Sequence, residues 1–292
     1  MIVVLPENFG YISAFLTMRC NLDCGFCLNA FSRKFDRKKF KETSGKLWVT
    51  ALNKIESRPE IPITFSGGEP FLHKDFIYIL NNVKPDLNID ILTNLQWGKR
   101  GLEKFIDEVD PKRIERDSPY PSIRVSYHPE QMGDGGALVE SVRALKDAGF
   151  SIGIWAVLYP SPAQLSAINQ MQFKCLDSGV EFRLKEFTGE YGGEEYGDYS
   201  KYPGATFKSD SELHGCLCRP SELLMSTDCR TYRCHRDLFS EESSTGNILD
   251  PNFRINTDYA PCDRYGQCHP CDVKVKTNSR QKLGHTSVEI EK

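Results

Sequence analysis

The chain has 292 residues, a formal net charge of −3 and 39% hydrophobic residues, which suits one large globular domain or one domain with a small appendage. This charge balance gives no basic surface for nucleic acid or for a lipid headgroup, so we expect neither partner. No apolar run approaches the ~20 residues of a membrane span, and the N-terminus lacks the basic region of a signal peptide, so we predict a cytoplasmic protein.

Apolar, strand-like runs alternate with helix-like segments over the first two thirds of the chain. Alternation of this kind favours βα units and a parallel sheet in the α/β class. The predicted strands are 11–18, 61–67, 88–94, 122–128, 151–160 and 180–187. The predicted helices are Thr43–Ser57, Lys74–Val83, Leu102–Glu108, Ala137–Ala148 and Pro162–Ser178. On the last of these helices, the isolated Cys175 is expected to be a small buried hydrophobe.

Several of these strands carry polar side chains on one face and apolar side chains on the other. Successive side chains of a strand point to opposite faces, so the apolar face should meet the helices. The polar face then lines an interior that can hold a charged, solvated ligand. The alternative is that these strands are sheet edges facing water. The polar positions are Thr64, Ser66, Ser122, Arg124, Ser126, His128, Glu181, Arg183 and Lys185.

Three cysteines, Cys20, Cys24 and Cys27, lie within eight residues directly after the first predicted strand. Eleven cysteines in a chain of this length without a signal sequence indicate metal or redox chemistry. Three thiolates on one short loop can serve as ligands of a [4Fe–4S] cluster, leaving one iron open for a cofactor or substrate. The alternative is a zinc site, although the second CxxC pair or histidines that zinc loops use do not follow closely.

A second motif, Gly67-Gly68-Glu69-Pro70, ends the second predicted strand. The CxxxCxxC loop with Phe26 before its third cysteine, followed by this GGEP sequence, resembles the radical S-adenosylmethionine (SAM) superfamily. The resemblance implies a partial (β/α)6 TIM-like barrel over residues 1–204, with both motifs at the C-terminal ends of strands, where such barrels carry their chemistry. A simple strand-to-helix turn is the alternative interpretation of the GGEP sequence.

The resemblance also implies roles for individual residues. Phe26 would stack near the adenine of SAM, and Glu69 would accept hydrogen bonds from the SAM ammonium. Gly67 and Gly68 lack a Cβ and would let the backbone approach a ligand closely. Further candidates, each with solvated charge or plain structure as the alternative, are Asn94 and Ser126 for SAM binding, and Lys185 and Arg183, with Arg124 and His128, for the substrate cavity.

Residues 189–199 are rich in glycine, tyrosine and acidic side chains. We expect a solvated connector to the next part of the chain. The alternative is a loop covering an active site, with acidic groups that favour a cationic substrate.

Seven further cysteines lie between residues 216 and 271. Runs at Leu223–Ser226 and Thr231–Arg233 predict a β-hairpin. This region resembles the SPASM or twitch auxiliary-cluster domains of radical SAM enzymes, although Cys229 replaces the glycine of the hairpin turn. The resemblance implies a domain at 205–275 with a second [4Fe–4S] cluster, followed by a flexible tail at 276–292. The expected ligands are Cys216, Cys234, Cys268 and Cys271, with Cys218, Cys229 and Cys262 as surplus, and a structural zinc on the same four sulfurs is the alternative.

The resemblance implies an oxidoreductase that reductively cleaves SAM to a 5'-deoxyadenosyl radical and abstracts hydrogen from a small-molecule or peptide substrate, with net oxidation through the auxiliary cluster. The electron donor would be of the flavodoxin or ferredoxin type. Alternatives are a redox-neutral epimerase or rearrangement enzyme, a maturase of ribosomal peptides, or a zinc-binding interaction protein. The chain begins close to its first strand, so we expect no N-terminal peptide-recognition domain.

Overall fold

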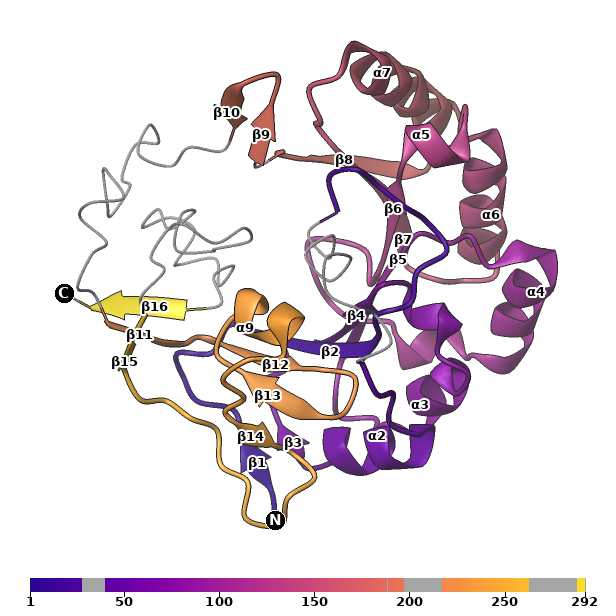
Figure 1. The fold of residues 1–292 in the computed structure, drawn as a ribbon. Helices are drawn as coiled ribbons and strands as arrows, with labels where there is room; N and C mark the ends of the chain where they lie inside the picture. Colours follow the sequence, from indigo (N-terminus) through magenta and orange to yellow (C-terminus); the bar gives the residue numbers. More distant parts are fainter. Residues whose placement is uncertain (28–39, 188, 197–216, 263–287, 292) are drawn as a thin grey trace.

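The computed structural model describes residues 1–27, 40–187, 189–196, 217–262 and 288–291. A curved sheet organises the fold. It contains nine strands in the order β14-β13-β12-β2-β4-β5-β6-β7-β8, and β2, β4, β5, β6, β7 and β8 run parallel to one another. These six strands follow one another in the chain and in the sheet, with helices on their outer side (Figure 1). The fold is therefore the partial TIM-like barrel that the sequence predicts.

The elements of the barrel agree with the predicted ones to within a few residues, except near residue 55, where a short strand replaces the end of a predicted helix. The strands are β1 Val3–Val4, β2 Tyr11–Thr17, β3 Ile55–Glu56, β4 Ile63–Gly67, β5 Ile89–Thr93, β6 Ile123–Tyr127, β7 Ile152–Val157 and β8 Glu181–Lys185. The helices are α2 Gly45–Leu52, η2 Pro70–Leu72, α3 Phe76–Asn82, α4 Gly98–Glu108, η3 Pro111–Arg113, α5 Pro129–Met132, α6 Gly136–Asp147 and α7 Pro162–Asp177.

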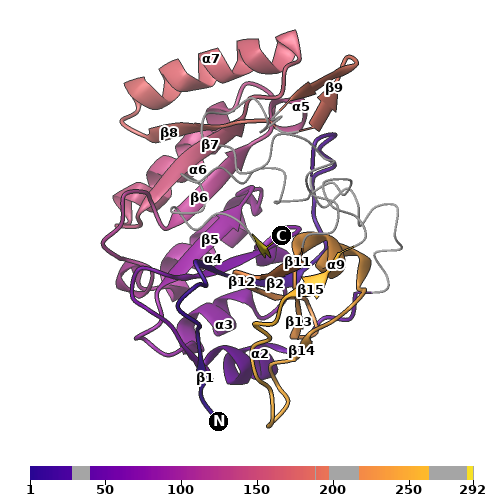
Figure 2. The ribbon, with the colours of Figure 1, turned by 90° about the vertical axis from the view of Figure 1, so that its left-hand side faces the viewer.

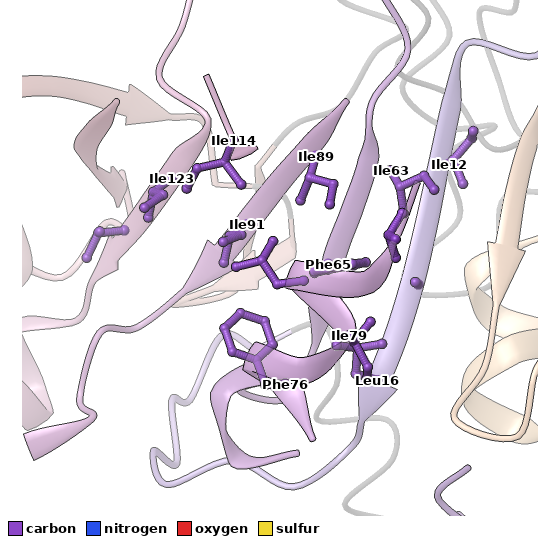
Figure 3. Packing of buried hydrophobic residues seen from close by; sticks show 14 of the residues in the cluster. Ile12, Leu16, Ile63, Phe65, Phe76, Ile79, Ile89, Ile91, Ile114 and Ile123 are labelled. Atoms are coloured by element: carbon purple, nitrogen blue, oxygen red, sulfur yellow. The ribbon is translucent and has the colours of Figure 1, made fainter. Parts of the chain in front are cut away.

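The main hydrophobic core lies between the sheet and the outer helices. Apolar residues at alternate strand positions, such as Ile63 and Phe65 of β4, lie on the face of the sheet that meets the helices. They belong to the same buried cluster as Phe76 and Ile79 of α3 (Figure 3). Cys175 of α7 is fully buried in the same core, and burial raises the pKa of its thiol to about 11. The prediction that Cys175 is a core residue is confirmed.

The other face of the barrel strands carries the polar residues. The hydroxyls of Ser13 in β2 and Ser66 in β4 are 2.7 Å apart and hydrogen-bonded across this face. Strand register extends the same face to Asp90 of β5 and Arg124 of β6, which form an ion pair of 3.1 Å. The predicted polar interior is therefore confirmed for β4 and β6, whereas β8 is an edge strand of the sheet with exposed Glu181 and Lys185.

The C-terminal part of the chain continues the barrel sheet. β12 and β13 form the predicted antiparallel hairpin, and β12 also pairs in parallel with β2 over four residues, from Glu222 with Tyr11 to Met225 with Ala14. Figure 2 shows the hairpin strands at one end of the sheet and α7 at the other. The remaining elements are β9 Gly189–Tyr191, β10 Glu194–Tyr196, β11 Leu217–Pro220, β12 Glu222–Met225, β13 Arg230–Tyr232, α9 His235–Ser240, β14 Gly246–Asn247, β15 Ala260–Pro261 and β16 Val288–Glu291.

Two segments for which the sequence predicts no regular structure contain strands where the structure describes them. Within the predicted connector, β9 and β10 form an antiparallel hairpin, whose turn residues Gly192 and Gly193 have φ of 62° and 83°. Within the predicted tail, β16 pairs with β11 and Glu289 contacts Arg219 at 2.7 Å. The alternation of Val288 and Ile290 with glutamates is the strand signal that was overlooked. In the described part of the chain, no helix has both the length and the apolar character to cross a bilayer.

Candidate cluster and cofactor site

The three clustered cysteines lie at the carboxyl edge of the parallel strands, on the loop that follows β2. None of Cys20, Cys24 and Cys27 is in a disulfide bond. Among the described residues, no three Cys, His, Asp or Glu side chains meet closely enough to hold a single metal ion. A cubane does not require such a meeting point, because each thiolate binds a different iron. The three thiolates of this loop are suitable donors for a [4Fe–4S] cluster, and the choice between a cluster and a zinc ion stays a prediction.

The Gly67-Gly68 pair packs directly against the base of the cysteine loop. A Cβ on Gly67 would lie 2.1 Å from the Thr17 carbonyl oxygen, and one on Gly68 would lie 2.1 Å from the Arg19 carbonyl oxygen. The Gly68 and Glu69 amides donate to these same two oxygens, both at 2.8 Å. In the structure, these glycines closely approach the backbone that precedes Cys20. A close approach to a ligand stays a prediction.

Glu69 is completely buried, and both of its carboxylate oxygens accept hydrogen bonds from the chain itself. The hydroxyl of Thr93 donates at 2.9 and 3.0 Å, and the backbone amide of Asn94 donates at 2.7 Å. The Phe71 amide and the Trp97 indole add two more bonds of 3.1 Å. Burial raises the pKa of Glu69. Through these contacts Glu69 holds the loop after β5 in place. A contact between Glu69 and the SAM ammonium stays a prediction.

Two side-chain amides reach from neighbouring strand ends to the cysteine loop. Asn94, directly after β5, donates to the Asn21 side chain at 2.8 Å and to the Cys20 sulfur at 3.7 Å. Gln131 of α5, which follows β6, accepts from the Asp23 amide at 2.7 Å and donates to the Cys24 sulfur at 3.6 Å. Gln131 could not be predicted from the sequence, because one glutamine beyond a strand carries no spacing signal.

Aromatic rings gather around Phe26 at the same edge. The ring of Phe26 lies 5.6 Å from that of His128 and 5.1 Å from that of Tyr159, which in turn contacts Phe187 and Tyr191. Burial lowers the pKa of His128 to about 4, so the imidazole is neutral at physiological pH. Its buried Nδ1 has no hydrogen-bond partner among the described residues. Flat rings beside an unused polar nitrogen are suited to a nucleobase.

The remaining predicted site residues lie at different positions along the barrel strands. Ser126 lies on the polar face of β6, as predicted. Lys185 lies at the carboxyl end of β8 and stays accessible to solvent, while surrounding protein and the Arg124 charge lower the pKa of its ammonium to about 8. Arg183 donates to the Pro119 carbonyl, in the loop before β6. Arg183 thus contacts the loop before β6, and its predicted role in the substrate cavity stays a prediction.

The second cysteine group is only partly within the described residues, because Cys216, Cys268 and Cys271 lie outside them. Cys218 of β11 hydrogen-bonds with Cys262 and interacts electrostatically with Cys234, and the bond to Cys262 together with burial raises the pKa of Cys218. Two of the three surplus cysteines are thus neighbours of a predicted ligand. The third, Cys229, is fully buried in the main core.

Curated proteins of similar sequence are named as GTP 3',8-cyclases. The chain is 23% identical to the GTP 3',8-cyclase of Sulfurovum sp. over 192 residues, which is 62% of this chain and 56% of that protein. It is 30% identical over 98 residues to the GTP 3',8-cyclase of Campylobacter jejuni, covering 31% of this chain and 30% of the relative. A probable GTP 3',8-cyclase of Methanopyrus kandleri is 30% identical over 79 residues, 27% of this chain and 24% of the relative. The matches thus span 56% of the length of the first relative and 30% or less of the other two. No protein-family model matches the chain.

A solved structure agrees with the fold. The crystal structure of Streptococcus suis SuiB bound to the precursor peptide SuiA superposes with a TM-score of 0.55, at 14% identity, over 84% of this chain and 63% of that one. Motif order, relatives and fold agree. The chain is similar in sequence and in fold to radical SAM enzymes. This similarity implies a [4Fe–4S] cluster and SAM, and the cysteine loop with its aromatic neighbours has the donors and flat surfaces that these cofactors need.

Proposed function

We propose that this protein is a radical SAM enzyme that binds a [4Fe–4S] cluster through Cys20, Cys24 and Cys27. The observation that carries the proposal is the three-cysteine loop at the carboxyl edge of the curved sheet, fixed from below by Gly67 and Gly68. When bound, cluster and SAM would supply a one-electron reductive cleavage and a 5'-deoxyadenosyl radical that abstracts hydrogen from the substrate. An external one-electron donor of the flavodoxin or ferredoxin type would serve this chemistry.

The residues of the chain then have separate tasks. Phe26 and the neutral His128 present a flat surface and an unused nitrogen for the adenine ring. Ser126 and Lys185 line the interior between this surface and the substrate. An ammonium with a pKa near 8 is mostly charged at neutral pH, so Lys185 would orient an anionic substrate group by a charge-assisted hydrogen bond. The polar inner face would keep the substrate beside the cysteine loop.

Two substrate classes follow from the similar proteins. SuiB was crystallised with a precursor peptide, and the curated relatives are named for a nucleotide, GTP. We propose a peptide or small-molecule substrate, with net oxidation as the reaction. A screen with GTP and with candidate peptides, read by intact mass, separates the classes, because oxidation removes two hydrogens from the product.

We further propose an auxiliary [4Fe–4S] cluster in the C-terminal region, in the manner of SPASM and twitch domains. The proximity of Cys218, Cys234 and Cys262 supports a ligand set that includes these three. The fourth ligand would come from Cys216, Cys268 or Cys271. Core burial supports the exclusion of Cys229.

The decisive experiment is anaerobic reconstitution with iron and sulfide, followed by incubation with SAM and dithionite. We expect 5'-deoxyadenosine and methionine from the wild-type protein and neither from the Cys20→Ala/Cys24→Ala/Cys27→Ala variant, whose auxiliary cysteines are intact. Absence of 5'-deoxyadenosine from the wild-type protein under every reductant and candidate substrate tried would overturn the proposal.

A further inference from the structure

Several N–H groups donate hydrogen bonds to the cysteine sulfurs of the loop. The Leu22 amide donates to the Cys20 sulfur at 3.4 Å, as loop geometry alone can bring about. The side chains of Asn94 and Gln131 come from two other strand ends and donate to Cys20 and Cys24 at 3.7 and 3.6 Å. Two separate elements thus direct a neutral donor at a predicted cluster ligand.

Each amide is itself held in orientation by its other atom. The oxygen of Asn94 accepts from the Gln96 amide at 2.9 Å, and that of Gln131 accepts from the Asp23 amide at 2.7 Å. With the oxygen so engaged, the NH2 group of Asn94 must face the loop. The backbone of Asn94 is fixed in turn by its 2.7 Å bond to Glu69. The donors are therefore oriented by bonds within the chain itself.

From these contacts we propose that Asn94 and Gln131 are positioning residues that set the reduction potential of the radical SAM cluster through N–H···S hydrogen bonds. The proposal rests on the proposed function, because it requires a cluster on Cys20, Cys24 and Cys27. Reduction adds negative charge that the cysteine sulfurs share, and a donor aimed at such a sulfur stabilises the reduced state more than the oxidised one. Removing the donor makes the potential more negative.

The test uses reconstituted full-length protein, titrated with reductant and followed by EPR of the reduced cluster. The spectrum of the Cys20→Ala/Cys24→Ala/Cys27→Ala variant is subtracted to remove any auxiliary-cluster signal. The variants are Asn94→Asp, which replaces the donor with a carboxylate and therefore adds the effect of a negative charge to the loss of the bond, and Gln131→Leu at an exposed position, which removes the donor without adding charge. The control is Glu130→Gln, an exposed neighbour on α5 with no sulfur contact among the described residues.

We expect each test variant to favour the oxidised cluster by about tenfold more than the wild type, a shift of ~59 mV to more negative potential. The deuterium-exchangeable proton coupling of the reduced cluster should also weaken. Glu130→Gln removes a negative charge, so general electrostatics would move its potential slightly in the opposite direction. A merely structural role would change the amount of cluster bound without shifting its potential.

The possible failures are distinguishable. A wild-type protein with no signal beyond that of the triple-cysteine variant contradicts the proposed function. A wild-type cluster whose potential and exchangeable couplings are unchanged in Gln131→Leu and in Asn94→Asp overturns the present inference and leaves the proposed function intact. If Asn94→Asp fails to bind a cluster, Gln131→Leu alone decides.

Discussion

At the scale of single residues, Gly68 shows how one missing side chain can decide whether the site exists. Gly68→Ala would place a Cβ 2.1 Å from the Arg19 carbonyl oxygen and would push the GGEP turn away from the cysteine loop. We expect a loss of about 3 kcal/mol in the free energy of unfolding and a large loss of bound iron. Urea unfolding and iron analysis measure these two effects.

The matched control for this change lies in the cysteine loop itself. A Cβ on Gly25 would meet no atom within 4 Å among the described residues, so Gly25→Ala should keep both stability and iron content. If the two variants behave alike, steric contact at Gly68 is not what positions the loop.

Cys229 is the residue at which the sequence departs from the hairpin pattern, and the structure gives the reason. It adopts φ of 66°, a value that favours glycine, yet its side chain fills the core. Cys229→Ala should cost about 1 kcal/mol through lost burial and leave iron content unchanged. Cys234→Ala should lower iron by the content of one cluster. Equal iron loss in both variants would instead make Cys229 a ligand.

His128 gives a prediction for pH. Its pKa is about 4 in the folded chain and ~6.5 when unfolded, so the unfolded state binds more protons below pH 6.5. The contribution of His128 to stability is complete above pH 6.5 and is lost as pH falls toward 4. We expect the loss to reach about 2 kcal/mol. This loss of stability should be absent in His128→Phe, which keeps an aromatic ring but has no titrating group. Urea unfolding of the cluster-free protein at pH 7 and 4.5 measures it, and an equal decline in both proteins would contradict the assignment.

At the scale of elements, the strands and helices of the barrel were predictable because their periodicity is local. The interior was predictable for the same reason, since alternation in β6 places Arg124 and Ser126 on one face. Contacts between residues far apart in the sequence were not predictable. Gln131 and Asn94 are distant in sequence from the cysteines that they reach, and no pattern in a single sequence records such a pairing. The pairing of β12 with β2 escaped prediction for the same reason.

The amino end of the barrel is closed by a buried ion network that joins β5, β6 and the loop before β6. Asp90 is fully buried and binds Arg116 through two bonds of 2.7 and 3.0 Å, and Arg124 through one of 3.1 Å. Asp90→Asn would leave two partly buried guanidinium groups without their countercharge. We expect a loss of about 3 kcal/mol in unfolding free energy.

The control for Asp90 is Asp86→Asn, which removes an exposed partner of Lys84 and should change stability by less than ~0.5 kcal/mol. Urea unfolding of both variants measures the difference. A loss in Asp90→Asn no larger than that in Asp86→Asn would show that the network does not hold these strands together.

At the scale of the whole molecule, the barrel and the C-terminal hairpin share one sheet and several cross-links. The Lys54 ammonium donates to the carbonyls of Ile248 and Leu249 at 2.8 and 3.0 Å, and the Thr43 amide donates to Thr227 at 2.8 Å. A second apolar cluster joins Phe15 of β2 to Leu224 of β12 and Phe239 of α9. These contacts predict that the described barrel and hairpin unfold together, even though the sequence pattern separates them at residue 205.

The three tryptophans of the chain, Trp48, Trp97 and Trp155, all lie in the barrel and report on it alone. Leu224→Ala, a change confined to the hairpin, should destabilise the protein by about 2–4 kcal/mol. If the two parts unfold together, tryptophan fluorescence and far-ultraviolet circular dichroism will both shift to lower urea by the same amount. Leu217→Ala, at a 36% exposed position of β11, is the control and should shift neither. A fluorescence transition that stays in place while the dichroism transition splits would mean that the hairpin unfolds on its own. The barrel tryptophans respond to Leu224 only through contacts between hairpin and barrel, namely the pairing of β12 with β2 and the apolar cluster that includes Phe15.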